Sequence, residues 1–268
     1  MTPPASTLSA AQVAAFQERG HLRMPEAFPR AVALEMQQHM WSELQEQFGI
    51  DRDDRGTWYQ PRRSLRAAKW DPLQRAIATE SVLGAITTLL DPAVRWNLPT
   101  NWGVVLITFP GRAPHDWSVP TTGWHYDFDL QDNAAAARGL FVFTFFSSVA
   151  SRGGGTLIVE GSHRLLRRFD ESLSPDERRS DHQTLRKRFL RYDPWLRVLC
   201  GVDPAPKDRV AYFMHEAREV RDVPVRVVEL TGEPGDVVLC HPLMLHVAAS
   251  NHADVPRFMR SQRICGHA

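Results

Sequence analysis

The chain has 268 residues, of which 43% are hydrophobic and 24% are charged, and its net charge is +1. This balance is ordinary for a soluble globular enzyme and argues against nucleic-acid or membrane-surface partners, which select for basic surfaces. No run approaches the roughly 18 apolar residues of a membrane span, and the first residues do not read as a signal peptide. Three widely spaced cysteines fit neither a disulfide framework nor a Cys-x-x-Cys metal site, so we expect a cytoplasmic protein.

The first hundred residues are predicted to be mainly helical. A serine N-cap and a glycine stop bound a helix over 9–20, and apolar residues at helical spacing predict a longer helix over 30–48. A third helix, over 81–90, should end at the Asp-Pro pair that follows it.

From residue 101 onward the pattern changes to short strands. Runs rich in β-branched and aromatic residues, separated by Gly, Pro and Ser turns, predict strands at 103–109, 140–146, 156–159, 225–230, 237–239 and 258–264. A polar stretch at about 164–219 has helical signal and reads as an insertion, either a lid or a surface excursion. We therefore expect a single domain over 1–268, mainly β with flanking helices, whose strands form a sandwich or barrel.

A candidate metal site lies in the segment Trp-His-Tyr-Asp-Phe at 124–128. In an extended segment, side chains two residues apart point to the same face, so His125 and Asp127 can reach one ion. The best third ligand is His246, just beyond a predicted strand, and Asp129 is an alternative ligand or an acceptor for His125. Two histidines and one carboxylate on one side of an ion suit non-haem Fe(II).

Arg257 follows His246 after a polar, turn-like segment that could form a hairpin. A hairpin would carry the guanidinium back beside the metal ligand, where it could hold a carboxylate through two parallel hydrogen bonds. The alternative is a surface arginine, because Arg260 and Arg263 lie nearby in the sequence.

Taken together, these motifs resemble the phytanoyl-CoA dioxygenase family. The resemblance covers nearly the whole chain outside the insertion, and it is carried by 13–22, 153–163, 235–246, Asn251 and Arg257. It implies a double-stranded β-helix, the cupin-like jelly roll, as the core. It further implies that His125, Asp127 and His246 bind Fe(II), and that Arg257 binds the distal carboxylate of 2-oxoglutarate.

The resemblance also implies the reaction and a second group of cofactor contacts. Members of the family hydroxylate small organic molecules and release succinate and CO2 from 2-oxoglutarate. They often place a serine two residues after the distal histidine, where this chain has Ala248, so we expect Thr108 or Thr144 to assist the cofactor carboxylate. Because Asp127 is present, a halogenating variant with an open ligand position is disfavoured.

The substrate is not specified by the sequence. Four aromatic residues could line its pocket, although core packing is the commoner use of such residues: Trp102, Trp117, Trp124 and Tyr126. Three arginines, Arg62, Arg63 and Arg66, could meet an anionic group or lie at the solvated surface. The pattern fits hydroxylation, desaturation or ring closure.

Two other classes of protein compete with this interpretation. A cupin-like enzyme could use Zn(II) or Mn(II) without 2-oxoglutarate, and Arg257 argues against it. A non-catalytic binding protein could have kept the barrel, but it would not need three metal ligands. Two further histidines, His163 and His241, are weaker metal-ligand candidates.

Overall fold

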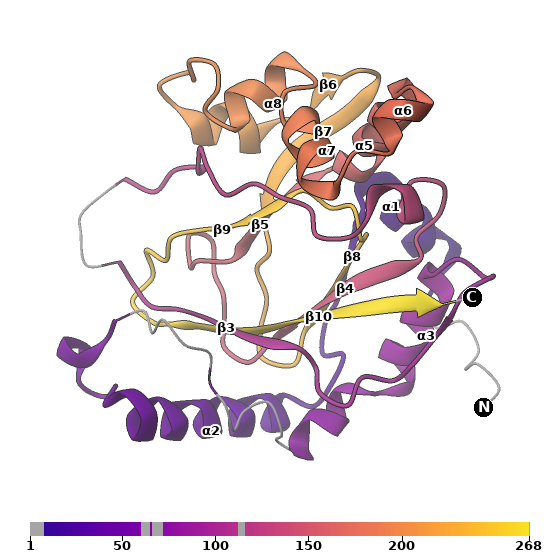
Figure 1. Ribbon diagram of the computed structural model, residues 1–268. Coiled ribbons are helices and arrows are strands. Elements are labelled where there is room, and N and C mark those ends of the chain that lie inside the picture. Colours follow the sequence, from indigo (N-terminus) through magenta and orange to yellow (C-terminus); the bar gives the residue numbers. More distant parts are fainter. Residues whose placement is uncertain (1–7, 60–64, 66–71, 112–115, 268) are drawn as a thin grey trace.

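The computed structural model describes residues 8–59, 65, 72–111 and 116–267. Its helices and strands are arranged in layers, with two β-sheets between an N-terminal helical layer and a second helical layer (Figure 1). The predicted arginine cluster at Arg62, Arg63 and Arg66 lies outside the described residues.

The N-terminal layer contains the three predicted helices, α1 (Ala10–Arg19), α2 (Arg30–Phe48) and α3 (Glu80–Leu89). Ser9 caps α1 in a capping box with Gln12, and Gly20 ends it in a left-handed conformation that suits glycine. Two 3-10 turns, η1 (Arg55–Thr57) and η3 (Pro72–Ile77), lie between α2 and α3. No helix in the described part of the chain is long and apolar enough to cross a membrane.

The larger sheet is antiparallel and has the strand order β1-β8-β4-β10-β2, with β3 also paired to β10. Its strands are β1 (His21–Met24), β2 (Arg95–Trp96), β3 (Val104–Thr108), β4 (Gly139–Phe145), β8 (Val237–Cys240) and β10 (Arg257–His267). Strand β4 pairs with β8 on one side and with β10 on the other. Neighbours in this sheet are therefore far apart in the sequence, as in a jelly roll.

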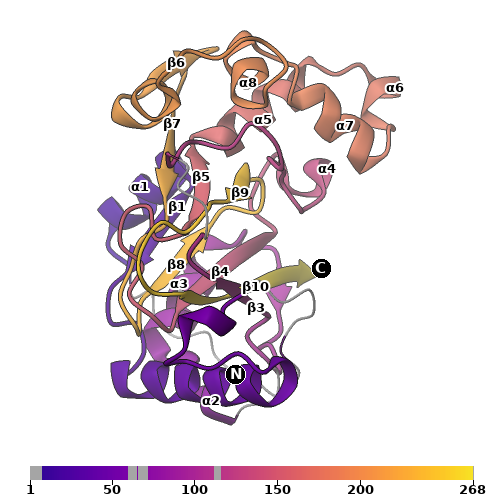
Figure 2. The same ribbon diagram turned by 90° about the vertical axis from the view of Figure 1, so that its left-hand side faces the viewer.

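The smaller sheet is also antiparallel and has the order β6-β7-β5-β9. It is formed by β5 (Thr156–Glu160), β6 (Arg218–Val220), β7 (Val223–Glu229) and β9 (His246–Ala248). Together the two sheets form a cupin-like jelly-roll core flanked by helices, which confirms the predicted fold class. Figure 2 shows α2 below the larger sheet and helices α5 to α8 above the smaller one.

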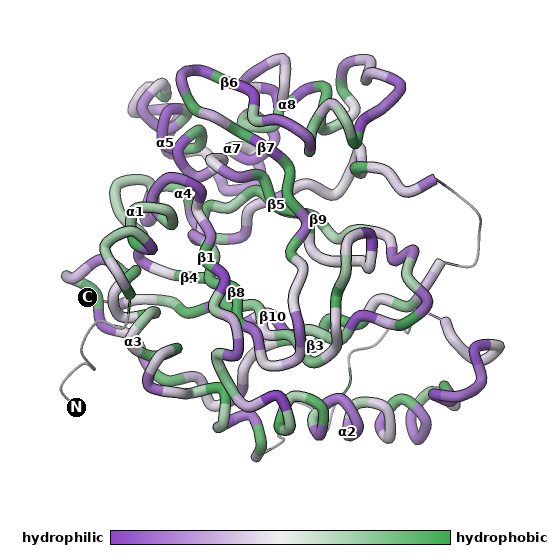
Figure 3. The backbone as a smooth tube through the Cα atoms, turned by 180° about the vertical axis from the view of Figure 1, so that it is seen from behind, coloured by the Kyte–Doolittle hydropathy of each residue, from purple (hydrophilic) through white to green (hydrophobic). Residues whose placement is uncertain are grey.

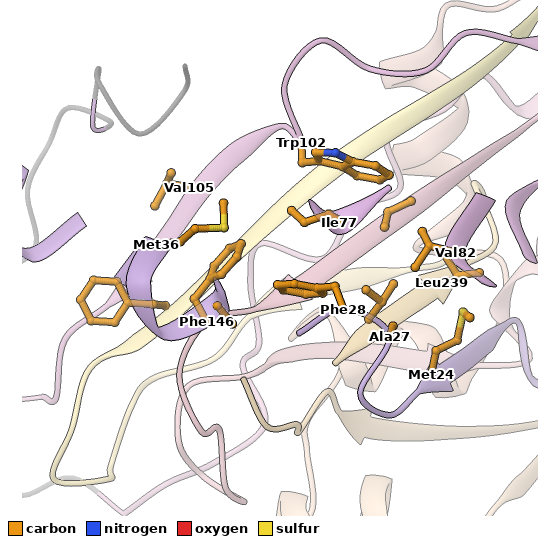
Figure 4. Close-up of a cluster of buried hydrophobic side chains, with 14 of the residues drawn as sticks. Met24, Ala27, Phe28, Met36, Ile77, Val82, Trp102, Val105, Phe146 and Leu239 are labelled. Carbon is orange, nitrogen blue, oxygen red and sulfur yellow. The ribbon is translucent and has the colours of Figure 1, made fainter. Parts of the chain in front are cut away.

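The larger sheet packs its outer face on the N-terminal helices. Along α2 hydrophilic and hydrophobic residues alternate (Figure 3), and Ala33, Met36, Met40 and Leu44, spaced three or four residues apart, are buried on one side. Side chains from α2, α3 and the sheet form one buried cluster, part of which Figure 4 labels: Met24, Ala27, Phe28, Met36, Ile77, Val82, Trp102, Val105, Phe146 and Leu239. Burial of this apolar surface fixes one face of the sheet and leaves the other for the barrel interior.

The chain between β5 and β6 forms the second helical layer. It holds α5 (Ser162–Ser172), α6 (Pro175–Arg178), α7 (His182–Phe189), α8 (Pro194–Leu199) and η4 (Ala211–His215). The Asp193-Pro194 pair separates α7 from α8, with Asp193 as the N-cap and Pro194 as the first helical residue. Phe169, Phe189 and Trp195 pack in one buried cluster with residues of the smaller sheet. The insertion is thus a helical layer that shares a buried core with the smaller sheet.

Candidate metal centre

His125 and His246 face each other across a short antiparallel bridge. The His125 N–H donates to the His246 carbonyl at 3.0 Å, and the His246 N–H donates to the His125 carbonyl at 2.9 Å. Directly opposed residues point their side chains to the same face of a sheet. The two imidazole rings accordingly lie with their centroids 4.2 Å apart.

Asp127 completes the group, because it lies two residues after His125 and points to the same face. Its Oδ1 is 3.6 Å from His125 Nε2, and its Oδ2 is 3.9 Å from His246 Nε2. One ligand atom from each of the three residues lies within 4.8 Å of the other two. Atoms that each bind one ion at about 2 Å have similar separations. The structure therefore brings the three predicted ligands together.

Hydrogen bonds to backbone carbonyls set the orientation of both imidazoles. His125 Nδ1–H donates to the Gly123 carbonyl at 2.7 Å, and His246 Nδ1–H donates to the Met244 carbonyl at 2.9 Å. Since a carbonyl only accepts, Nδ1 carries the proton in each ring and Nε2 keeps its lone pair. Both Nε2 atoms are those nearest Asp127, so the donor set of two imidazoles and one carboxylate fits a ferrous ion.

The three ligands differ in their exposure to solvent. His246 is only 8% exposed and lies beside the ring of Phe141, whose centroid is 5.2 Å away. Burial lowers the pKa of His246 below its ordinary value, which favours the neutral imidazole with an unprotonated Nε2. The side chains of His125 and Asp127 are 34% and 28% exposed. The open side of the centre is therefore at His125 and Asp127.

Arg257 is the first residue of β10 and is 4% exposed. Its Nη1 donates to the Gly154 carbonyl at 2.5 Å, while its Nε has no hydrogen-bond partner among the described residues. Burial lowers the pKa of Arg257 to about 10, and the nearby Glu229 carboxylate acts in the opposite direction. The guanidinium is thus a buried cation at neutral pH, and its Nε–H lacks a hydrogen-bond partner among the described residues.

The structure places the two candidate threonines on opposite faces of the larger sheet. Thr108 is paired directly with Arg257, so their side chains share a face. In β4, Phe141 and Phe143 lie in the cluster inside the barrel. Thr144 lies on the other face, with neighbours that pack on the N-terminal helices. Thr144 therefore lies on the opposite face of β4 from Phe141 and Phe143, whereas Thr108 shares a face of the sheet with Arg257.

The glycine-rich turn before β5 shows a structural role for Gly154 and Asn251, two motif residues for which the sequence analysis predicts no function. Gly154 has φ +79°, and a Cβ on it would lie 2.8 Å from Asn251 Cβ and 3.3 Å from Thr108 Cγ2. Asn251 Nδ2 donates to the carbonyls of Thr108 and Val255 at 2.9 and 2.8 Å. This close packing connects the turn that holds Arg257 to β3 and to the chain entering β10.

Most of the other predicted candidates have structural roles. Asp129 caps α4 (Leu130–Asn133), because its side chain accepts from the backbone N–H groups of Gln131 and Asp132. The rings of His163 and His241 pack at a tilt with their centroids 4.6 Å apart, and neither residue belongs to the group of potential ligands.

The four aromatic candidates are all buried in cores. Trp102 lies in the cluster under the N-terminal helices, while Trp117, Trp124 and Tyr126 lie in the cluster under the insertion. The sequence interpretation had overlooked the carbonyls of Gly123 and Met244. Each precedes a ligand histidine by two residues, a repeated spacing that could have indicated them.

Comparison with solved structures finds the same fold in several proteins, among them two whose titles name alpha-ketoglutarate or 2-oxoglutarate. The structure titled non-heme alpha ketoglutarate dependent carbocyclase SnoK, from nogalamycin biosynthesis, has a TM-score of 0.52 and 16% identity, covering 97% of this chain and 84% of that one. EctD from S. alaskensis, solved with 2-oxoglutarate and 5-hydroxyectoine, has a TM-score of 0.53 and 15% identity, with coverages of 97% and 77%. AviO1 from Streptomyces viridochromogenes Tue57 has a TM-score of 0.51 and 16% identity, with coverages of 97% and 96%.

No family model and no curated protein matches the chain. At these identities the structural likeness shows the fold alone, and the shared fold is the cupin-like jelly roll with flanking helices. The predicted membership of the phytanoyl-CoA dioxygenase family stays a prediction.

Proposed function

We propose that this protein is an Fe(II)- and 2-oxoglutarate-dependent dioxygenase of the phytanoyl-CoA dioxygenase type. It would hydroxylate a small organic molecule and release succinate and CO2. The observation that carries the proposal is the convergence of His125, Asp127 and His246, with both Nε2 atoms directed at the carboxylate by hydrogen bonds on Nδ1. Three protein ligands on one side of an ion leave positions for a cofactor and for oxygen.

The three ligands would hold the iron, and Arg257 would hold the distal carboxylate of 2-oxoglutarate. When bound, the ferrous ion and 2-oxoglutarate supply the oxidation of the substrate by O2. The buried guanidinium pairs with a carboxylate more strongly than it would in water, because few solvent dipoles compete with it. Thr108, directly opposite Arg257, can donate its hydroxyl to the same carboxylate.

The remaining contribution of the protein is to orient these groups and exclude water. His246 is shielded by Phe141, whereas His125 and Asp127 are partly exposed, so we place the substrate on the side of His125 and Asp127. The presence of Asp127 favours hydroxylation over halogenation. The structural neighbours support the reaction class, since the SnoK title gives alpha-ketoglutarate dependence and EctD was solved with 2-oxoglutarate.

The proposal is tested by measuring succinate formed from 2-oxoglutarate in the presence of Fe(II) and O2. Slow turnover without a substrate is sufficient for this assay, because it requires only the metal and cofactor sites. His246→Ala should abolish succinate formation, whereas His252→Ala, at an exposed histidine outside the ligand group, should leave it unchanged. Equal succinate formation by wild type and His246→Ala would refute the assignment. Metal binding without any 2-oxoglutarate binding would favour a cupin-like enzyme of another type.

A further inference from the structure

The insertion contacts the residue that separates two of the three ligands. Tyr126 lies between His125 and Asp127, so its side chain points to the opposite face, where it is fully buried under the insertion. The ring of His182, the first residue of α7, packs edge-on against the Tyr126 ring at 5.0 Å. Phe189, at the other end of α7, makes a similar contact at 6.1 Å.

His182 also contacts the backbone of the ligand segment. Its Nε2 is 3.2 Å from the carbonyl oxygen of Tyr126, and since that oxygen only accepts, Nε2 carries the proton. The carbonyl belongs to the peptide group that joins Tyr126 to Asp127. Because a peptide group is planar, holding its oxygen also fixes the direction in which the chain enters Asp127.

The position of His182 is itself fixed by the start of α7. Asp181 is the N-cap, and its side chain accepts from the Thr184 N–H at 3.0 Å. Leu185 and Phe189 anchor the helix in the buried cluster beneath the insertion. The imidazole therefore extends from a capped and packed helix, which makes it a rigid donor.

Two further contacts tie the insertion to the same segment. The side-chain amide of Gln131, just after the ligands, donates to the Arg178 carbonyl. The buried guanidinium of Arg209 links the chain before the ligands to α8 by donating to the carbonyls of Val119, Pro120, Val198 and Leu199. The insertion thus holds the ligand segment before, within and after the His-x-Asp motif.

We infer that His182 is a positioning residue for the metal centre, which sets the direction of Asp127 through the Tyr126 carbonyl. The insertion thereby holds in position the segment that carries His125 and Asp127. This inference rests on the proposed function, because it assumes that the three ligands bind a metal. Groups that orient metal ligands without touching the ion typically change metal affinity by about 10- to 100-fold when they are removed.

Two substitutions separate the hydrogen bond from the packing of the ring. His182→Phe keeps a ring against Tyr126 but removes the N–H donor, whereas His182→Gln removes the ring and keeps an N–H donor. Co(II), whose visible absorption reports its coordination, can be titrated into each metal-free variant to give a dissociation constant. We expect the dissociation constant to rise about 10-fold or more in His182→Phe and to stay within about 3-fold of wild type in His182→Gln.

The controls distinguish this inference from the proposed function. Gln183→Ala, at an exposed position on the same helix, should bind Co(II) as the wild type does. His246→Ala should show no binding at the site. Wild-type Co(II) affinity in His182→Phe would overturn the positioning role of His182 but not the metal centre. An equal loss of Co(II) affinity in His182→Phe and His182→Gln would do the same. Identical Co(II) titrations of wild type and His246→Ala would instead refute the metal centre.

Discussion

The backbones of His125 and His246 donate hydrogen bonds to each other at 3.0 and 2.9 Å, so the main chain holds the two imidazole ligands together. Each ring also donates a hydrogen bond from Nδ1 to a nearby backbone carbonyl, that of Gly123 for His125 and that of Met244 for His246. Hydrogen bonds within the chain therefore support the approach of the two rings. If the group binds a metal as proposed, it is preorganised, and its metal affinity could be changed without unfolding the protein.

Asp127→Asn tests this separation of metal binding from folding. The substitution keeps the shape of the side chain but removes its charge, and the position is 28% exposed, so little packing is lost. We expect metal affinity to fall by about 100-fold or more, with the melting temperature of the metal-free protein changed by only a few degrees. Isothermal titration with Fe(II) or Co(II) and a thermal scan measure the two quantities. A large loss of stability would show that Asp127 also supports the fold.

Arg257→Lys tests the recognition of the cofactor carboxylate. Lysine keeps the positive charge near Glu229 but lacks the planar fork of the guanidinium. We expect the affinity for 2-oxoglutarate to fall by about 10- to 100-fold, because a bidentate pair is replaced by a point contact, while metal affinity is retained. Titration of the Zn(II)-loaded protein with 2-oxoglutarate measures this. Unchanged 2-oxoglutarate affinity would mean that another residue binds the carboxylate.

Gly154→Ala tests the packing of the turn that holds Arg257. Alanine at φ +79° is strained, and its Cβ would meet Asn251, so we expect a loss of about 2–4 kcal/mol in the free energy of unfolding. Gly49→Ala is a matched control, because Gly49 has φ +66° but nothing within 4 Å of the added Cβ. It should cost only about 1–2 kcal/mol. Urea denaturation of both variants measures the difference, and equal losses would contradict the close packing.

The lowered pKa of the buried His163 side chain predicts that the folded protein loses stability in acid. Burial lowers its pKa to about 4, below the ordinary value of about 6.5 expected in the unfolded chain. As the pH falls from 6.5 to 4, the unfolded state binds the proton first, so up to about 3 kcal/mol of stability is lost over this window. Burial lowers the pKa of the adjacent His241 in the same direction.

His163→Gln should reduce this pH dependence, because glutamine does not titrate and can still donate to the Gln17 carbonyl that His163 contacts. Urea denaturation at pH 7 and pH 4.5 gives the free energy of unfolding for each protein. The difference between the two pH values should be smaller in the variant. An equal difference in both proteins would show that His163 does not contribute to the acid sensitivity.

The sequence predicted most strands and the pairing of His125 with Asp127 on one face, because both follow from local patterns. Side chains two apart in an extended segment share a face, which was enough to pair His125 with Asp127. Turn residues and β-branched runs predicted β3, β4 and β10 within a few residues. The short β9, which carries His246, has no such run and became visible only in its pairing with β5.

Sequence patterns are uninformative where tertiary packing decides the outcome. Strand β4 is buried along its whole length on both faces, so its sequence has no polar alternation to show which face Thr144 shares. The contact between Tyr126 and His182 depends on the docking of α7, which no local pattern predicts. Asp129 was a plausible ligand by spacing, but it caps α4.

An anaerobic titration of the metal-free protein with Fe(II) and then 2-oxoglutarate tests the central claim most directly. A ferrous ion that is held by the three ligands and chelated by the keto acid gives a visible metal-to-ligand charge-transfer band. We predict that the wild type develops this band, that Asp127→Asn greatly reduces it, and that Arg257→Lys requires more 2-oxoglutarate to reach it. A protein that binds Fe(II) but develops no band at saturating 2-oxoglutarate would contradict the proposed function.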